Sequence, residues 1–95
     1  DFTAGSNTQG VGVGDLNGDN KLDLISVNNS ANSISVFRNT ATSGTITTGS
    51  LATKVDFTSG TAPLYGISVG DLDGDGKPDV VVPNSGANTV SVFRN

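Results

Sequence analysis

The chain contains no cysteine, histidine, methionine or tryptophan, and its only aromatic residues are one tyrosine and four phenylalanines. Without cysteine there is no disulfide framework. Without histidine there is no serine–histidine–aspartate triad, and with both residues missing the usual nitrogen and sulfur ligands of zinc are absent. No apolar run is long enough for a transmembrane helix, so we expect no membrane insertion. Triad hydrolases and zinc sites are therefore removed from consideration.

Glutamate is also absent, so all nine acidic residues are aspartate, and the net charge is −4. Seven of the nine lie in two short stretches, DLNGDNKLD (Asp15–Asp23) and DLDGDGKPD (Asp71–Asp79), whereas Asp1 and Asp56 lie outside them. A solvated acidic surface would mix glutamate with aspartate and scatter both. The distribution therefore indicates a site. Because no basic stripe is present, we expect no nucleic-acid partner.

The sequence contains an internal repeat, which is the strongest indication of its domain organisation. Residues 10–39 and 66–95 align without a gap and are identical at 17 of 30 positions. Upstream, DFTAG (1–5) matches DFTSG (56–60) once one extra residue is allowed in the second copy. Apolar and charged positions match together, so chance similarity in a glycine- and serine-rich chain does not explain the repeat. We expect a first repeat unit at 1–39, a Thr/Ser/Gly-rich connector with the start of an outer strand at 40–55, and a second unit at 56–95.

Good helix formers are scarce and no stretch has a period of 3.6 residues, so the expected fold class is all-β. Short runs rich in β-branched residues flank each acidic stretch, and the alternating segments SISVFR and TVSVFR place Phe37 and Phe93 on a face that we expect to be packed. Each repeat then has about four short antiparallel strands, the unit of a β-propeller blade. The expected strands are Val11–Leu16, Leu22–Val27, 33–38, a weak strand at Gly44–Thr48, the outer strand Lys54–Gly60, Ile67–Leu72, Asp79–Val82 and 89–94.

Numbered from its first aspartate, each acidic stretch carries side-chain oxygens at positions 1, 3, 5 and 9. A chain that wraps around a hard cation points alternate residues inward, and the carbonyl at position 7 can join them. Glycine or asparagine at positions 4 and 6 permits the positive-φ turns that such a wrap requires; these residues are Gly18, Asn20, Gly74 and Gly76. The predicted metal ligands are Asp15, Asn17, Asp19, Lys21 and Asp23 in the first stretch, and Asp71, Asp73, Asp75, Lys77 and Asp79 in the second.

Calcium is the ion that this pattern favours. It takes about 6–8 oxygen ligands at about 2.3–2.6 Å in a flexible shell. An EF-hand would require a glutamate at position 12, where this chain has Ser26 or Val82 in a strand. The alternative is an Asx-rich hairpin turn without metal, since Asp-Gly and Asn-Gly are ordinary turn formers. Two matching loops make that alternative the weaker one, because carboxylates so crowded repel each other unless neutralised. We expect two calcium sites, with tighter binding at Asp71–Asp79, which has four carboxylates instead of three.

The segment VGDLNGDNKLDLISVNNSANSISVFRN and its second copy resemble FG-GAP/VCBS repeats, the blades of integrin-α-type β-propellers. The first copy departs from the pattern at Asn20 and Leu22. The resemblance implies that each acidic loop joins two neighbouring strands of a blade and binds calcium, through the eight side chains at positions 1, 3, 5 and 9. Two blades cannot close a ring, since propellers have about 4–8. We therefore expect the two blades to be completed either by other copies, head to tail in a ring or filament, or by further repeats of a longer chain.

Three classes of function can be compared on this sequence. Catalysis is disfavoured, because the serines lack a base and the paired carboxylates are better explained as metal ligands. A binding module for glycans or proteins would want exposed aromatic rings, and Tyr65 is the only one in an expected loop, where packing at a blade junction is the preferred interpretation. A structural, assembly or adhesion module of a secreted or cell-surface protein fits best. The Thr/Ser/Asn/Gly-rich, glutamate-free composition suits that setting, where millimolar calcium fills modest sites.

Overall fold

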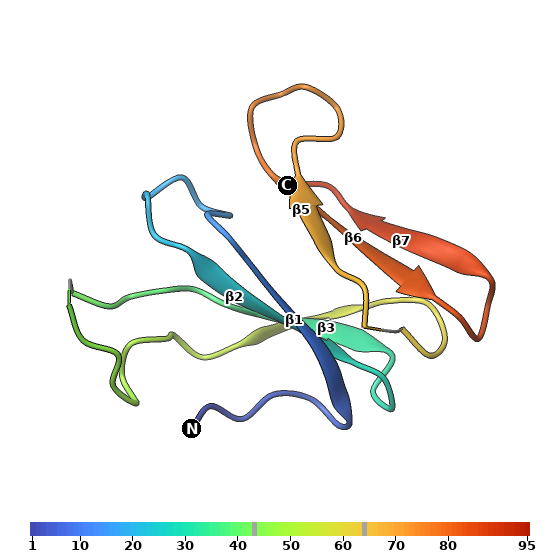
Figure 1. Ribbon diagram of the computed structural model, residues 1–95, viewed down its shortest axis with the longest axis horizontal. Helices are drawn as coiled ribbons and strands as arrows, with labels where there is room; N and C mark the ends of the chain where they lie inside the picture. The colour runs from blue at the N-terminus through green and yellow to red at the C-terminus, as the bar shows by residue number, and fades with distance from the viewer. Residues whose placement is uncertain (43, 64) are drawn as a thin grey trace.

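The computed structural model describes residues 1–42, 44–63 and 65–95, and the described chain forms seven β-strands in two antiparallel sheets (Figure 1). The first sheet has the order β1-β2-β3-β4 and the second the order β5-β6-β7. This confirms the all-β prediction. None of the described residues belongs to a helix that could cross a membrane. The strands are β1 (Thr8–Gly14), β2 (Asp23–Asn28), β3 (Ser33–Phe37), β4 (Val55–Thr58), β5 (Ser68–Gly70), β6 (Asp79–Asn84) and β7 (Thr89–Phe93).

The two sheets repeat one strand order, as the duplicated sequence requires. In each, an acidic loop joins the first strand to the second, and a short turn joins the second to the third. The short turns contain Asn32 and Asn88, with φ of 49° and 53°. Asparagine tolerates this left-handed conformation better than most residues, which explains its place in both copies. The molecule is a flat plate of 40 × 33 × 16 Å.

The predicted weak strand at Gly44–Thr48 is wrong, because Gly44–Thr48 adopts turns and irregular structure. Backbone groups of the connector form hydrogen bonds with its own side chains and not with a neighbouring strand. The Ser50 hydroxyl accepts a hydrogen bond from the Thr47 N–H at 2.8 Å, and an isolated bridge joins Asn39 to Leu51. Serine and threonine commonly compete with regular structure in this way.

The outer strand expected at Lys54–Gly60 is present as β4, and it pairs with β3 through Val36–Val55, Ser35–Asp56 and Ile34–Phe57. The first sheet therefore has four strands, the number that was predicted, but its fourth strand comes from the stretch that was expected to divide between the connector and the second unit. The second sheet has three, so a four-stranded second blade is not formed, and among the described residues nothing pairs with the outer edge of β7. The described sheets do not close into a ring.

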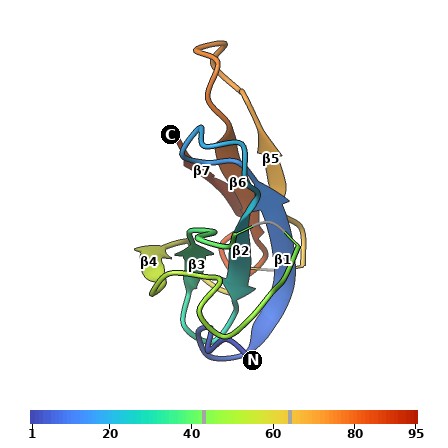
Figure 2. The ribbon, with the colours of Figure 1, turned by 90° about the vertical axis from the view of Figure 1, so that its left-hand side faces the viewer.

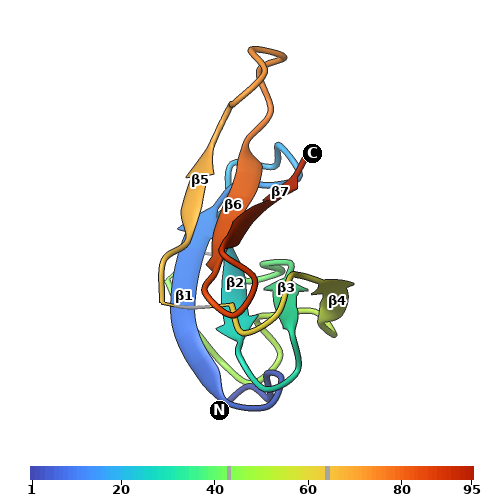
Figure 3. The same cartoon turned by 90° about the vertical axis from the view of Figure 1, so that its right-hand side faces the viewer.

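The core lies between the two sheets and is built from Ile25, Val27, Ile34, Val80 and Val82, each at most 4% exposed. Figures 2 and 3 show β5 beside β1, where the two sheets approach most closely. The expected packing of the two phenylalanines is confirmed: one is 4% exposed, and the other packs on the core and meets Phe57 edge to face, with ring centroids 6.2 Å apart. Each sheet thus contributes one face to the core, whereas Phe37 lies on the other face of the first sheet, beside residues 1–3 and 51–54.

Candidate metal centre

Asp15 organises the first acidic loop, which connects β1 to β2. Its Oδ1 accepts hydrogen bonds from the backbone N–H groups of Gly18 (2.8 Å) and Asp19 (3.1 Å), and its Oδ2 accepts one from that of Asn20 (2.7 Å). Asn17 Oδ1 accepts from the Asp19 N–H at 3.0 Å. These bonds pull the backbone into a tight curl around one carboxylate, with the side chains at positions 1, 3 and 5 on the same short arc.

The second loop, between β5 and β6, repeats this curl bond for bond. Asp71 Oδ1 accepts from the N–H groups of Gly74 (2.7 Å) and Asp75 (3.1 Å), and its Oδ2 accepts from that of Gly76 (2.8 Å). Asp73 Oδ1 accepts from the Asp75 N–H at 3.2 Å, as Asn17 does in the first loop. The loop geometry is therefore a property of the repeat and does not depend on whether position 3 is an amide or a carboxylate.

Both curls use the left-handed backbone that was expected at positions 4 and 6. The φ angles are 77° at Gly18, 64° at Asn20, 79° at Gly74 and 86° at Gly76, which confirms that prediction. Glycine adopts such an angle without steric cost, whereas asparagine adopts it at a cost that is smaller than for most other residues. The second loop, with glycine at both positions, is thus the less strained of the two.

The last aspartate of each loop is also the first residue of the following strand and is buried. Asp79, 1% exposed, accepts hydrogen bonds from the N–H groups of Asn95 (2.9 Å) and Leu72 (3.0 Å). These two bonds, from Asn95 first, lower the pKa of Asp79 below its ordinary value. The same pair of backbone bonds forms at Asp23, which is 2% exposed. A carboxylate held ionised at the buried end of the loop is suited to a cation.

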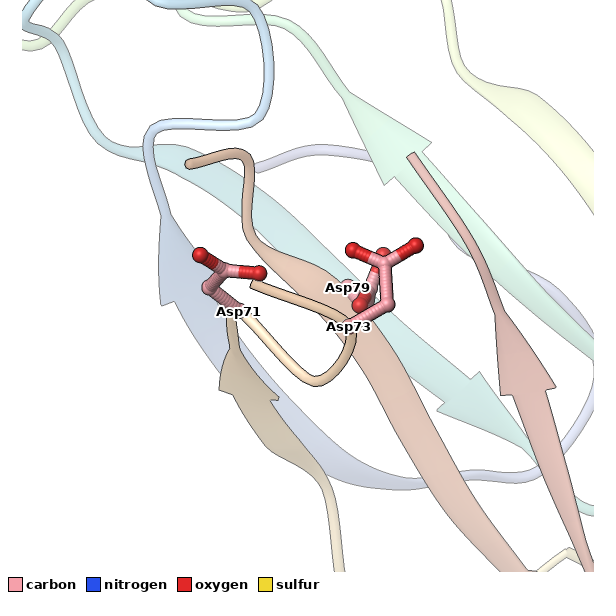
Figure 4. Close-up of side chains that lie close together, drawn as sticks. All are labelled: Asp71, Asp73 and Asp79. Atoms are coloured by element: carbon pink, nitrogen blue, oxygen red, sulfur yellow. The ribbon is translucent and has the colours of Figure 1, made fainter. Parts of the chain in front are cut away.

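Three carboxylates of the second loop converge. One oxygen from each of Asp71, Asp73 and Asp79 lies within 4.8 Å of the other two (Figure 4). Asp75, although predicted as a ligand, is not in that group. Within the described part of the chain the three aspartates of the first loop do not form such a cluster, and Asn17 occupies the place that corresponds to Asp73. The structure therefore brings together part of the predicted ligand set, most closely in the loop with more charge.

Lys21 and Lys77, whose carbonyls were predicted to serve at position 7, lie exposed in the loops. Their backbone N–H groups donate to Asp19 Oδ1 and Asp75 Oδ1, both at 2.9 Å. These bonds shape the loop without involving the carbonyl oxygens. The metal-binding role of the two carbonyls remains a prediction.

Arg94 enters the second site, and the sequence analysis missed it. Its Nε pairs with Asp73 and its Nη2 with Asp75, the latter at 3.2 Å. The two carboxylates, Asp73 first, raise the pKa of the guanidinium. Arg38 holds the corresponding place in the first repeat and makes no ion pair within the described residues. The only signal available in the sequence was that position 3 of the second loop is charged and could attract the arginine at the end of the blade.

The donor set fits a calcium ion. The side chains that converge in the second loop offer only oxygen. Asp71 Oδ2, Asp73 Oδ1 and both oxygens of Asp79 each accept one backbone hydrogen bond and keep a second lone pair. Three negative charges within 4.8 Å, offset on the described surface by one exposed guanidinium, leave a net negative site. A hard divalent cation is the group that best neutralises such a site.

Comparison with known proteins identifies the repeat. A family profile described as an FG-GAP-like repeat matches residues 15–82, which include both acidic loops and the strands between them. No curated protein and no solved structure matches the chain. Because the match covers more than half of the chain, the protein belongs to the FG-GAP-like repeat family.

Proposed function

From its membership of the FG-GAP-like repeat family, we propose that this chain is a calcium-binding module of the β-propeller type with a structural role. One observation supports the proposal: the two loops share the same internal backbone hydrogen bonds, and in the second loop three carboxylates converge within 4.8 Å. An Asx turn without metal needs only the carboxylate that accepts the backbone bonds of the curl. It does not account for the convergence of three carboxylates beside a single exposed guanidinium.

Bound calcium would hold together the two strands that each loop joins. Each loop joins the end of one strand to the start of the next, and its last aspartate is buried at that start. Bound calcium would neutralise the repulsion among the carboxylates and fix the hairpin. The side chains that would hold it are Asp15, Asn17, Asp19 and Asp23 in one loop and Asp71, Asp73, Asp75 and Asp79 in the other. Divalent ions in both sites would raise the formal charge from −4 to 0.

The setting that we propose is extracellular or on the cell surface, in a structural, assembly or adhesion role without catalysis. The loops are exposed, so we expect calcium affinity to be modest, and a high calcium concentration is then needed to fill the sites. The composition, without glutamate and rich in small polar residues, supports the same setting.

A second candidate, calcium-dependent binding of a carbohydrate or a protein ligand, is favoured by Tyr65. The expectation that this side chain packs at a blade junction is wrong, because the residue is 69% exposed. Its backbone carbonyl, and not its ring, lies close to Gly10 of the first sheet. An exposed ring is the kind of surface on which sugars stack, and a glycan-array screen with and without calcium tests this candidate.

Titration calorimetry with calcium and with magnesium tests the main proposal, together with melting curves in calcium and in EDTA. We expect two calcium-binding events, weaker magnesium binding, and a melting temperature that falls when EDTA is added. Asp56→Asn is the matched control, because it removes a carboxylate outside both loops. Absence of calcium binding at millimolar concentration, with melting indifferent to EDTA, would rule the proposal out.

A further inference from the structure

The contact between the two sheets shows which side chains allow one repeat to pack against the next. Val69 of β5 packs over Gly14 of β1, where an added Cβ would lie 2.6 Å from a valine methyl. Ile67 packs over Gly12 in the same way, with 2.9 Å to the nearest methyl. At these two positions the interface therefore sets branched side chains of residues 67–69 against glycines of β1.

The counterparts of the valine and of the glycine in this interface lie on the two outer faces, where neither meets a neighbour. The repeat offset of 56 residues makes Val13 the counterpart of Val69, and Val13 is 56% exposed on the outer face of the first sheet, here called the head face. The same offset makes Gly70 the counterpart of Gly14. An added Cβ at Gly70 meets nothing within 4 Å on the outer face of the second sheet, here called the tail face.

Further apolar residues of both faces show the same complementarity, although Ser68 stands on the tail face at the position that Gly12 has in the first sheet. On the tail face, Val90 and Val92 are 64% and 50% exposed, whereas their counterparts in the first sheet, Ile34 and Val36, pack in the core. On the head face, Val11 is 64% exposed, and its counterpart is Ile67, which packs against the core. The apolar residues exposed on the outer face of each sheet are thus the counterparts of residues that the other sheet buries in the core.

The open edge of β7 gives a second complementary feature. In the first sheet, the DFT segment of β4 pairs with β3, and the Ser35 hydroxyl donates to Asp56 Oδ1 at 2.6 Å. The second sheet has the counterpart serine, Ser91, but no fourth strand within the described residues. Residues 1–3 have the same DFT sequence, and Phe2 lines a surface pocket together with Phe37. This repeats the arrangement of the corresponding pair of phenylalanines, which meet edge to face between β4 and β7.

We infer that the tail face of one chain binds the head face of a second copy, with Val13 of the second copy over Gly70 and its residues 1–3 added to the edge of β7. This inference deepens the proposed structural role and rests on it. The contact is heterologous, so successive copies form a closed ring if the rotation returns to the start, and a filament if it does not. Pairing the exposed edge also removes an unpaired row of backbone groups.

Two substitutions test the contact from its two sides. Gly70→Val fills the space reserved for the incoming valine, and within one molecule it meets no neighbour. Val13→Asp puts a charge on the head face at a position that is solvent-exposed in one molecule. In calcium, sedimentation of the unaltered chain between about 1 and 200 µM should show a mass that rises above the monomer, and each variant alone should associate at least about tenfold more weakly.

Mixing the two variants is the decisive step. The Gly70→Val chain keeps its head face and the Val13→Asp chain keeps its tail face, so the mixture should give a one-to-one dimer that cannot grow. An isologous dimer or non-specific aggregation would not produce this result. Circular dichroism checks that both variants fold, and Val92→Asp replaces Gly70→Val if the latter does not.

The inference is overturned if the folded, calcium-loaded chain stays monomeric at about 200 µM, if either variant associates as the parent does, or if the mixture stays monomeric. Calorimetry on the same samples separates this outcome from failure of the proposed function. Calcium binding by a chain that remains a monomer refutes the docking surface alone, whereas loss of calcium binding refutes the metal site.

Discussion

The clearest test of the metal sites exchanges the one ligand position at which the two loops differ in charge. Asp73→Asn gives the second loop the amide of the first, and Asn17→Asp gives the first loop the carboxylate of the second. Both side chains already accept the same backbone hydrogen bond, at 3.2 Å for Asp73 and 3.0 Å for Asn17. The exchange therefore changes charge and preserves the fold of the loop.

The magnitude follows from the geometry. A carboxylate and a divalent ion with charges about 3 Å apart attract by about 3 kcal/mol at the dielectric constant of water, which suits an exposed loop. The amide oxygen that replaces the carboxylate still coordinates and recovers part of this energy. Asp73 also repels Asp71 and Asp79, whose oxygens lie within 4.8 Å, but that repulsion exists before the ion binds. About 1–2 kcal/mol should remain, so Asp73→Asn weakens calcium binding roughly 5- to 30-fold, and Asn17→Asp strengthens the first site by a similar factor.

Titration calorimetry resolves the two sites when their affinities differ. In the parent chain the tighter event should belong to Asp71–Asp79, and in Asp73→Asn the two events should merge. The double exchange should reverse their order, while Asp56→Asn leaves both unchanged. Equal affinities in the parent chain, or a change of less than about twofold in either single variant, would refute the reasoning that carboxylate count sets affinity here.

Three further outcomes are expected. Gly14→Ala should lower the free energy of unfolding by about 1–3 kcal/mol in urea denaturation, because its Cβ would lie 2.6 Å from a valine methyl of β5; unchanged stability would contradict the close approach of the sheets. Arg94→Gln should tighten calcium binding at the second loop by up to about fivefold, since an exposed ion pair contributes about 0–1 kcal/mol, and Arg38→Gln should not. Asp56, whose pKa is lowered first by Lys54 and then by a serine hydroxyl, should stabilise β4 above the ordinary aspartate pKa of about 3.9. Because its folded pKa is depressed, this stabilisation is lost as the pH falls below about 4, so melting temperatures of parent and Asp56→Asn should converge there; a gap that widens in acid would contradict it.

Local chemistry in the sequence was sufficient to predict most of the fold. The 56-residue duplication required two sheets of the same design, and β-branched runs on either side of the acidic loops placed their strands. The left-handed turns followed from glycine and asparagine at fixed positions, since few other residues adopt that backbone. These features depend on neighbours in sequence, which is why the sequence shows them.

Features that composition and spacing do not determine were missed or mispredicted. Arg94 reaches the second loop from the end of β7, and nothing in the sequence distinguishes it from Arg38 except the charge of its target. The connector was given a strand because Gly44–Thr48 has β-forming residues, but its hydroxyl groups bond locally. The Tyr65 side chain was expected to pack at a blade junction. The backbone of the residue lies there, but its ring is exposed. In each case the outcome depends on which partner is within reach.

The low hydrophobic content and the exposed apolar residues have a common origin in the repeat. At 34% hydrophobic residues, the chain has little material for an isolated core, yet Val11, Val13, Leu72, Val90 and Val92 are each at least half exposed. All five have counterparts 56 residues away that lie in or against the inter-sheet core. In a stack of repeats, stability comes from the interfaces between neighbours as well as from each unit. A residue that is buried in one copy and exposed in the other therefore marks a face at which one sheet has a neighbour and the other has none, as the docking contact that we propose requires.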